Sequence, residues 1–369
     1  MAFVLGIVSY PFLPAKTGGQ KNVHLFYKYL HRWTPVTVVA TVNNDLRAAA
    51  GYKVLPVFSA SPLRYINPSN IFRLRKIIRQ EKATHIVLEH PYLGWLGFIL
   101  KHFCGVKLVL RSHNIEGLRW KSLGKWWWKG LWIYEKYTHR SADYNLFITP
   151  EDMRYALGHW KLDPARCTVF SYGFERESIP PAAERAAARE KLQSRHDIPT
   201  DTGILLFNGI FNYRPNLEAL QYILDYIDPL LKNTPGFHYR IIICGKDIPP
   251  DLDDRYPGIV FAGFVEDIDT YLMGADVFLN PIVEGGGIKT KLVEALGNNL
   301  SAVSVRNGAI GVDPALCGGK LLIAENADWT HFAHLVVTAA SQKLDTPPEW
   351  FTHFYWGHST RHVAEFISK

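Results

Sequence analysis

Short apolar runs recur along the chain and constrain its fold more than any other feature of the sequence. In the first half, such runs predict strands at 3–10, 36–42, 54–58, 85–89, 107–111, 144–149 and 168–172. Their β-branched and aromatic residues show little polar alternation, which is typical of strands buried on both faces of a parallel sheet. Segments with helical periodicity fall between them, at 20–33, 71–81 and 151–160. The first half is therefore predicted to be a doubly wound α/β domain.

A break divides this pattern into two domains. Residues 175–202 contain Pro180, Pro181 and Pro199 around an Ala/Arg/Glu-rich stretch, so they continue no sheet. A second alternating series follows, with strands expected at 203–209, 239–244, 259–263, 276–281, 301–305 and 320–323 and helices at 216–231, 267–274, 288–296 and 328–340. We predict two Rossmann-like parallel-sheet domains, residues 1–175 and 176–348, that face each other across a cleft. The aromatic segment 349–369 is expected to be a helix that packs back on the first domain.

The composition indicates a globular protein, and its cysteines form no CxxC metal or redox motif. The chain has 369 residues, of which 47% are hydrophobic and 20% charged, a globular composition that allows two cores. Its four cysteines form no CxxC pair and are expected to be reduced thiols in the cytoplasm. The net charge of +7 favours an anionic partner, which could be nucleic acid, phospholipid headgroups or a phosphorylated substrate.

No segment predicts insertion into a membrane. The apolar residues 1–10 have neither a basic region nor a small-residue cleavage site, so they are a poor signal peptide and are expected to form the first strand. No apolar stretch reaches the roughly 18 residues that a membrane-spanning helix needs. We expect a cytoplasmic protein, and peripheral contact with the inner face of the membrane stays open.

The most informative stretch is 281–296, where an expected strand ends in three glycines and a helix follows. Gly285, Gly286 and Gly287 allow the backbone to approach a ligand closely. The amides that open the expected helix, at Gly287 and Ile288, carry partial positive charge. The combination predicts a phosphate-binding loop. It lacks the third glycine of GxGxxG and the GK[ST] of a Walker loop, so it predicts neither dinucleotide binding nor ATP hydrolysis.

Two charged residues follow this loop on one face of the expected helix. Lys291 and Glu294 are three residues apart. The lysine can neutralise phosphate, and the carboxylate can accept hydrogen bonds from ribose hydroxyls. Together they suggest a nucleoside diphosphate. The alternative is a glycine-rich turn followed by a solvated Lys/Glu pair.

Ordered motifs in the second half carry a family resemblance. They are FNGIFNYRPNLEAL at 207–220, GFVED at 263–267, GADV at 274–277 and the segment 281–296. With these motifs the sequence resembles the GT-B glycosyltransferases, and within them the retaining family numbered four. The resemblance implies that the second domain holds a nucleotide-sugar donor, that the first holds the acceptor, and that transfer retains the anomeric configuration.

The resemblance also implies roles for particular residues. Glu294 falls on the family's ribose-binding glutamate. Gly18 and Gly19 match glycines of an N-terminal loop that closes over the donor phosphates. His113, in the segment RSHNIE, matches the histidine that faces the transferred sugar, whereas taken alone it is a satisfied strand-end histidine more often than a functional one.

Two positions depart from the family pattern. Many members carry a glutamate eight residues before the ribose-binding one, where this chain has Gly286. Glu284 stands two residues earlier, which leaves its contact with the sugar open. Many members also carry an arginine directly after the glycine that ends the first strand of the second domain, here Gly209. Ile210 occupies that place, and Arg214 is the substitute we expect to contact phosphate.

The expected chemistry needs charge and positioning more than covalent groups. The leaving group is a nucleoside diphosphate, so Lys291, Arg214 and the glycine loop would stabilise its developing charge, and Lys291, Glu294 and His113 are the expected catalytic residues. No protein nucleophile and no cofactor is required. Two Asp-x-Asp strings occur, at 251–253 and 267–269. We interpret the first as loop and the second as a helix cap, and metal is not expected.

An aromatic and basic segment occupies residues 119–140 and contains five tryptophans. Trp126, Trp127, Trp128 and Lys129 would suit a membrane interface, with rings at headgroup depth and cations against anionic lipid. The alternative is a buried amphipathic helix whose lysines and arginines reach out to solvent. No nucleic-acid-binding motif is visible, so a nucleic-acid partner is not expected.

The leading functional prediction is a retaining glycosyltransferase that moves a sugar from a nucleotide-diphosphate sugar to a lipid-linked or cell-surface glycan precursor. Two alternatives remain. A nucleotide-sugar epimerase of the same fold would isomerise the donor without an acceptor. A catalytically silent subunit would bind the sugar nucleotide without turnover.

Overall fold

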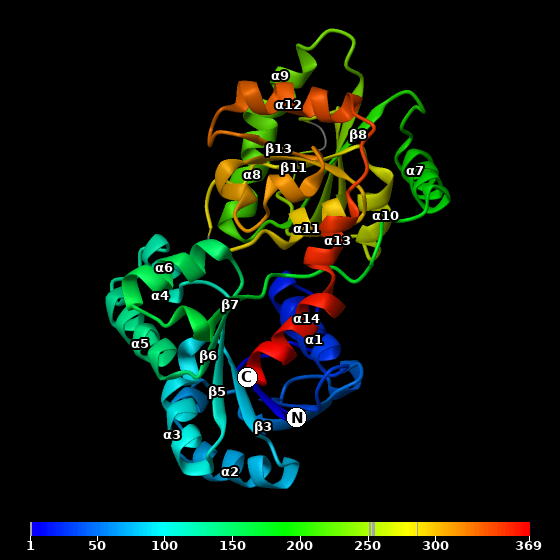
Figure 1. The fold of residues 1–369 in the computed structure, drawn as a ribbon. Helices are drawn as coiled ribbons and strands as arrows, with labels where there is room; N and C mark the ends of the chain where they lie inside the picture. The colour runs from blue at the N-terminus through cyan, green and yellow to red at the C-terminus, as the bar shows by residue number, and fades with distance from the viewer. Residues whose placement is uncertain (1, 251, 253–254, 286) are drawn as a thin grey trace. The chain divides into compact units, whose positions relative to one another are not determined.

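Two parallel sheets organise the chain, and each belongs to its own compact unit. The structure is a computed structural model that describes residues 2–250, 252, 255–285 and 287–369. Unit 1 comprises Met1–Glu175 and Phe354–Lys369, and unit 2 comprises Arg176–His353. Each unit is an α/β layer structure with helices on both faces of its sheet (Figure 1). The predicted pair of Rossmann-like domains is confirmed.

The sheet of unit 1 has the strand order β3-β2-β1-β4-β5-β6-β7, and all neighbouring strands pair in parallel. Its strands are β1 (Val4–Ile7), β2 (Val36–Thr41), β3 (Lys53–Phe58), β4 (His85–Glu89), β5 (Lys107–Ser112), β6 (Tyr144–Phe147) and β7 (Cys167–Val169). Every residue of β1, β2 and β4 is buried, as the continuous apolar runs predict for strands covered on both faces. The strand order reverses between β1 and β4, the place where open α/β sheets bind ligands.

Helices cover this sheet on both faces. They are α1 (Gly18–Leu30), α2 (Ser69–Glu81), α3 (Gly94–Cys104), α4 (Glu116–Ser122), α5 (Trp128–Ser141), α6 (Pro150–Trp160) and α14 (Trp356–Ile367), with short 3-10 turns η1 (Leu46–Ala48), η2 (Pro62–Tyr65), η3 (Pro91–Leu93) and η4 (Pro164–Arg166). Helix α1 begins two residues earlier than predicted because Thr17 and Gln20 form a capping box at its start. Gly18 and Gly19 are therefore in the first helical turn, not in the preceding loop.

The C-terminal helix α14 packs against α1 within unit 1. Trp356 is fully buried, and its ring lies against Tyr29, Phe170 and Tyr172. The expected terminal segment 349–369 is divided in the structure. Residues 349–353 group with unit 2 as part of α13 (Pro348–Phe354), and residues from Phe354 onward group with unit 1.

The sheet of unit 2 has the strand order β10-β9-β8-β11-β12-β13, again parallel. Its strands are β8 (Gly203–Ile210), β9 (Tyr239–Lys246), β10 (Ile259–Gly263), β11 (Val277–Asn280), β12 (Ser301–Val305) and β13 (Leu321–Ala324). The helices are α7 (Ala182–His196), α8 (Arg214–Tyr222), α9 (Asp228–Lys232), α10 (Ile268–Gly274), α11 (Thr290–Gly297), α12 (Trp329–Ser341) and α13, with the turns η6 (Arg306–Ala309) and η7 (Pro314–Cys317). The core lies between this sheet and α8, α9 and α12.

Two local predictions in unit 2 need correction. The stretch expected as a break between domains contains α7, whose buried Ala188 and Leu192 pack directly on Gly274 of α10. The single helix expected at 216–231 is interrupted by the π-helical segment η5 (Ile223–Ile227). Pro229 accounts for the interruption, since proline cannot donate a helical hydrogen bond and clashes with the preceding turn.

Candidate functional site

A glycine loop in unit 2 connects β11 to α11 and passes over the start of α8. Gly285 has φ +97° and Gly287 has φ +70°, backbone conformations that favour glycine. A Cβ on Gly285 would lie 3.4 Å from the Tyr213 hydroxyl and 3.7 Å from Pro215. Gly286 lies outside the described residues. Both described glycines thus adopt backbone conformations that favour glycine, and their approach to a ligand stays a prediction.

Lys289, which no sequence motif indicated, holds this loop together. Its Nζ donates to the carbonyl oxygens of Gly285 at 2.8 Å and Gly287 at 3.1 Å. Lys289 itself is extended, with φ −87° and ψ 96°, so α11 begins at Thr290. This corrects the expected helix start: the amides that open α11 belong to Thr290 and Lys291, and not to Gly287 and Ile288.

Lys291 points from α11 to the end of β8. Its Nζ donates to the Asn208 carbonyl at 2.6 Å and to Asn216 Oδ1 at 3.1 Å. Asn216 lies against Gly209, where a Cβ would sit 3.1 Å from the Asn216 side chain. Burial lowers the pKa of Lys291 to about 8, although Glu294 acts in the opposite direction. The structure thus brings Lys291, Gly209 and Glu294 together, and adds Asn216, which was not predicted as a site residue from the sequence.

Arg214 and Glu284 lie apart from this buried cluster. The Arg214 side chain is 75% exposed and donates to Glu218 Oε1 at 2.6 Å. Its pKa is raised, chiefly by the hydrogen bond to Glu218 and to a smaller extent by the Glu284 carboxylate. Arg214 is therefore engaged in a surface ion pair, so a phosphate contact would have to compete with Glu218.

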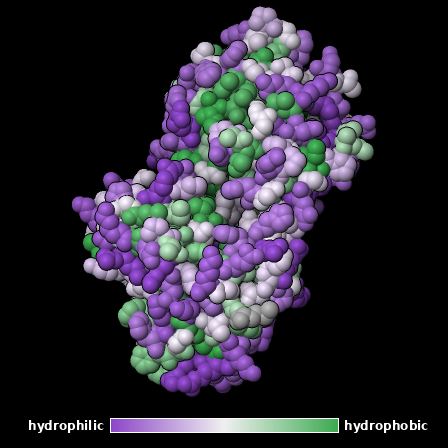
Figure 2. Space-filling view, viewed as in Figure 1, coloured by the Kyte–Doolittle hydropathy of each residue, from purple (hydrophilic) through white to green (hydrophobic). Residues whose placement is uncertain are grey.

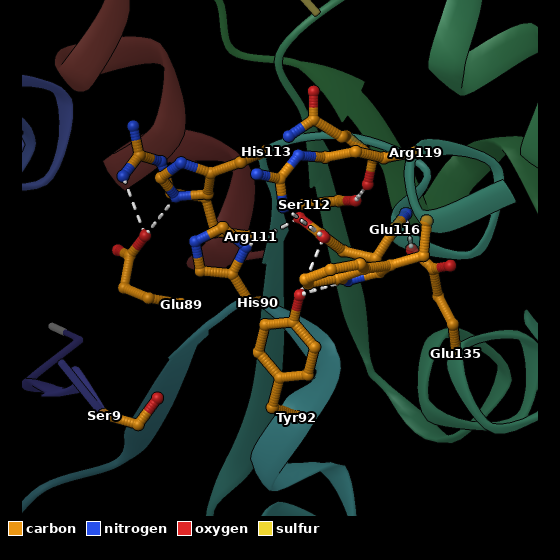
Figure 3. A network of polar contacts seen from close by, with 12 residues as sticks. Ser9, Glu89, His90, Tyr92, Arg111, Ser112, His113, Glu116, Arg119 and Glu135 are labelled. Atoms are coloured by element: carbon orange, nitrogen blue, oxygen red, sulfur yellow. Dashed lines mark hydrogen bonds and ion pairs between the residues drawn. The ribbon is translucent and has the colours of Figure 1, made fainter. Parts of the chain in front are cut away.

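Unit 1 places a buried ion cluster at the carboxyl ends of β4 and β5. Glu89 Oε2 lies 3.0 Å from Arg111 Nη1 and 2.6 Å from His113 Nε2 (Figure 3). Asn22 Oδ1 accepts from Arg111 Nη2 at 2.5 Å. Burial by itself would raise the pKa of Glu89, but Arg111 and His113 outweigh it and lower that pKa to about 2. Glu89 is thus a buried carboxylate with two basic partners.

Both ring nitrogens of His113 have partners inside unit 1. Nε2 faces Glu89, and Nδ1 lies 3.5 Å from Asn22 Nδ2. Burial lowers the pKa of His113, so the ring is neutral near pH 7. Glu89, Arg111 and Asn22 were not predicted as site residues from the sequence. The polar residue that ends the apolar run 85–89 was a signal that could have indicated Glu89.

The other candidates of unit 1 are at its surface. Gly19 is exposed, and a Cβ there would meet nothing within 4 Å. Trp126 is 89% exposed and Trp127 38%, whereas Trp128 is half-buried between Lys121 and Lys129, whose Nζ atoms lie 4.9 and 5.8 Å from its ring. The segment before α5 is therefore not buried. Apolar residues interrupt the hydrophilic surface in the area of α4, α5 and α6 (Figure 2).

The second Asp-x-Asp string caps a helix. Asp267 accepts hydrogen bonds from the Thr270 amide at 3.2 Å and the Thr270 hydroxyl at 2.6 Å, as predicted for an N-cap. The first string falls mostly outside the described residues. Within the described ranges no group of three or more His, Cys, Asp or Glu side chains could hold a metal ion, and no helix is long and apolar enough to cross a bilayer.

Each unit matches a model of a known protein family. The model described as "Glycosyltransferase Family 4" matches residues 17–178, and the model described as "Glycosyl transferases group 1" matches residues 202–342. The chain is a glycosyltransferase of the family 4 and group 1 type. Its GT-B fold is shared by solved structures of low sequence identity. HepE of Anabaena, in complex with UDP, superimposes with a TM-score of 0.73 at 14% identity over 99% of each chain.

Two further proteins are similar to this chain over all or part of its length. Sucrose-phosphate synthase of Thermosynechococcus elongatus gives a TM-score of 0.68 at 16% identity, over 98% of this chain and 94% of that one. D-inositol 3-phosphate glycosyltransferase of Corynebacterium glutamicum (strain R) is 25% identical over 178 residues. That match covers 47% of this chain and 41% of the relative.

Proposed function

We propose that this chain transfers a sugar from a nucleotide-diphosphate sugar to an acceptor with retention of anomeric configuration. The observation that carries the proposal is the placement of Lys291. Its ammonium, the opening amides of α11 and the left-handed glycines of the preceding loop all lie at the carboxyl end of the unit 2 sheet. Ligands bind at this edge of open α/β sheets. Such a group of donors suits a diphosphate.

The chemistry follows from this charge distribution. As the bond between the anomeric carbon and the diphosphate breaks, negative charge develops on the leaving oxygen. The Lys291 ammonium has three N–H donors, of which two are held by Asn208 and Asn216, so one can stabilise the phosphate without reorganisation. Glu294, on the same helix, would accept hydrogen bonds from the ribose hydroxyls. Attack from the front face needs no protein nucleophile.

We propose that the donor is bound without metal or cofactor. The solved HepE complexes contain UDP and UDP-glucose, which makes uridine the first base to test here. His113, Gly18 and Gly19 are assigned to the donor side through the family resemblance, with Arg214 and Glu284 as outer contacts. These assignments are proposals that mutagenesis can check.

The acceptor is proposed to be a lipid-linked or cell-surface glycan precursor. The support is the exposed Trp126 and Trp127 beside Lys121, Lys125 and Lys129, an arrangement that suits an anionic membrane surface. A cytoplasmic enzyme that docks on the inner face of the membrane would meet such an acceptor where it is anchored.

The first experiment measures the melting temperature of the purified chain with UDP, GDP, ADP and CMP. A ligand that binds the native state raises the melting temperature with its concentration. The nucleotide-sugar of the base that binds is then incubated with a panel of octyl monoglycosides, and we expect transfer with retained anomeric configuration. Isomerisation of the donor sugar without acceptor would favour the epimerase. Donor binding without turnover would favour the catalytically silent subunit.

Matched variants test the site itself. Lys291→Ala removes a transition-state charge and should lower transfer by roughly 100-fold. Glu294→Ala should weaken donor binding by roughly tenfold, the effect of one lost hydrogen bond to a charged group. Lys191→Ala and Glu190→Ala, which alter exposed residues of α7, are the controls and should leave both quantities unchanged. Full activity in both site variants would contradict the assignment.

A further inference from the structure

A second histidine lies where the strand order of unit 1 reverses. His90 directly follows β4, and Tyr10 lies just beyond the neighbouring strand β1. Their ring centroids are 5.5 Å apart. The ring of His90 also stacks on that of His113, with centroids 4.2 Å apart. His90 therefore lies next to the histidine that the family resemblance indicates.

The backbone of His90 is held in a conformation that residues with a side chain rarely adopt. Its φ is 69° and its ψ 160°. Such strain persists only where the surrounding structure imposes it, and it is concentrated at functional sites. Here Glu116 Oε1 lies 3.1 Å from His90 Nδ1 (Figure 3), while the stacked His113 ring supports one face.

The partner of Nδ1 determines what the other nitrogen can do. Burial would raise the pKa of Glu116, but hydrogen bonds from His90 and Tyr92 and the nearby Arg119 charge lower it to about 2, so Glu116 is an anion and can only accept. His90 Nδ1 must then donate to Glu116, and in the tautomer that carries its proton on Nδ1 the other nitrogen, Nε2, presents a lone pair. A ligand that meets Nε2 must donate a hydrogen bond.

His90 and His113 differ in what they can offer. Both nitrogens of His113 are bonded, to Glu89 and Asn22, and its side chain is 7% exposed. The His90 side chain is 15% exposed, and within the described residues the only side-chain hydrogen bond found for its ring is that of Nδ1. Of the two stacked rings, His90 is the one with a nitrogen available to a ligand.

We propose that Nε2 of His90 accepts a hydrogen bond from the attacking hydroxyl of the acceptor, and that Glu116 is a positioning residue that selects the tautomer. This inference rests on the proposed glycosyl transfer. The proposal places the acceptor hydroxyl beside Tyr10, where the strand order of the unit 1 sheet reverses between β1 and β4. It also explains why a strained backbone is retained at His90, since relaxation would turn the ring away from Glu116.

The tautomer is tested first, by nitrogen NMR of the full chain labelled with 15N-histidine. His90→Ala identifies the signals. We expect Nδ1 to be protonated and Nε2 unprotonated, and titration with octyl monoglycosides should shift the Nε2 signal. Glu116→Gln can donate to Nδ1 and should invert the tautomer. Protonated Nε2 in the unaltered chain, or an Nε2 signal that no glycoside shifts, would overturn the inference.

Kinetics then separate His90 from the donor site. His90→Ala should lower transfer to the best octyl monoglycoside at least tenfold, while UDP affinity and donor hydrolysis by water stay within twofold. His102→Ala, on the exposed face of α3, is the matched control. An equal fall in donor hydrolysis would overturn the acceptor assignment. A chain that binds no nucleoside diphosphate would disprove the proposed function. The NMR titration would still test, independently, whether a glycoside hydroxyl binds Nε2 of His90.

Discussion

At the scale of single residues, each unit holds a charged group that is largely or fully buried. Lys291 is tied to two oxygen atoms of unit 2, and Glu89 to two basic groups of unit 1. In each case burial disfavours the charged form and a nearby opposite charge favours it. For Lys291 the effect of burial is larger, so its pKa is lowered and the charged form is disfavoured. For Glu89 the effect of the basic partners is larger, so its pKa is also lowered, which for a carboxylate favours the anion.

The lowered pKa of Lys291 predicts a pH dependence of nucleotide binding. With a pKa of about 8 in the free protein, the ammonium is mostly present at pH 7 and mostly lost at pH 9. A bound diphosphate favours the charged form, so affinity should be constant below the pKa and fall above it. If only the ammonium binds, UDP should bind about tenfold more weakly at pH 9 than at pH 7.

Isothermal titration of UDP at the two pH values measures this effect, and Lys291→Arg is the matched control. The guanidinium keeps its charge over the whole range, so the pH dependence should disappear even if the affinity is lower. The same tenfold loss in Lys291→Arg would show that another group titrates.

At the scale of elements, the most informative case is the return of α14 to unit 1. The Phe174 amide donates to the Phe354 carbonyl at 2.6 Å, and the Trp356 amide donates back to the Phe174 carbonyl at 3.0 Å. Gly173 is required beside this connection because a Cβ there would lie 2.6 Å from the Trp356 ring. The indole thus anchors a helix that is remote in sequence from the sheet it covers.

Removal of this anchor should destabilise unit 1. Trp356→Ala leaves a cavity among Tyr29, Phe170 and Tyr172 and should lower the free energy of unfolding by about 3–5 kcal/mol. Urea denaturation followed by circular dichroism measures the change. Trp126→Ala removes an 89% exposed indole and serves as the control, with an expected change within about 0.5 kcal/mol. A loss below about 1 kcal/mol for Trp356→Ala would mean that α14 contributes little to the stability of unit 1.

At the scale of the whole molecule, the relevant property is the net charge of +7 combined with exposed indoles. Charge alone does not select among nucleic acid, lipid and a phosphorylated substrate. The grouping of Trp126 and Trp127 with Lys121, Lys125 and Lys129 suits lipid, because tryptophan rings and cations together match the headgroup region of an anionic membrane.

This property predicts sedimentation of the full chain with anionic vesicles. Phosphatidylglycerol-containing vesicles should bind the protein at low salt and lose most of it at 1 M salt, where the screening length falls to about 3 Å. The double change Trp126→Ala and Trp127→Ala should abolish most of the binding. Trp33→Ala, which removes a 40% exposed indole elsewhere, should leave it intact. Binding that persists in the double variant would place the contact elsewhere.

The amino-acid sequence was sufficient to predict the parallel-sheet units and most strands, because a strand covered on both faces must be apolar along its length. It also predicted that Lys291 and Glu294 lie on one helix, which α11 confirms, since residues three apart share a helix face whatever the rest of the chain does. It could not indicate helix α7 as part of a packed layer, or Lys289 as the cation that holds the glycine loop. Which carbonyl oxygens a lysine reaches depends on loop conformation, which no local pattern specifies.

Only the tertiary structure decided which polar side chains meet. Glu89, Arg111 and Asn22 are far apart in sequence, and they come together because the strand order places β4 beside β5 and packs α1 over them. For the same reason His90 lies against His113, although nothing in the sequence pairs them. The pattern of apolar residues along the chain predicts which segments are buried. Contacts between strand ends depend on the strand order of the sheet, which only the folded chain defines.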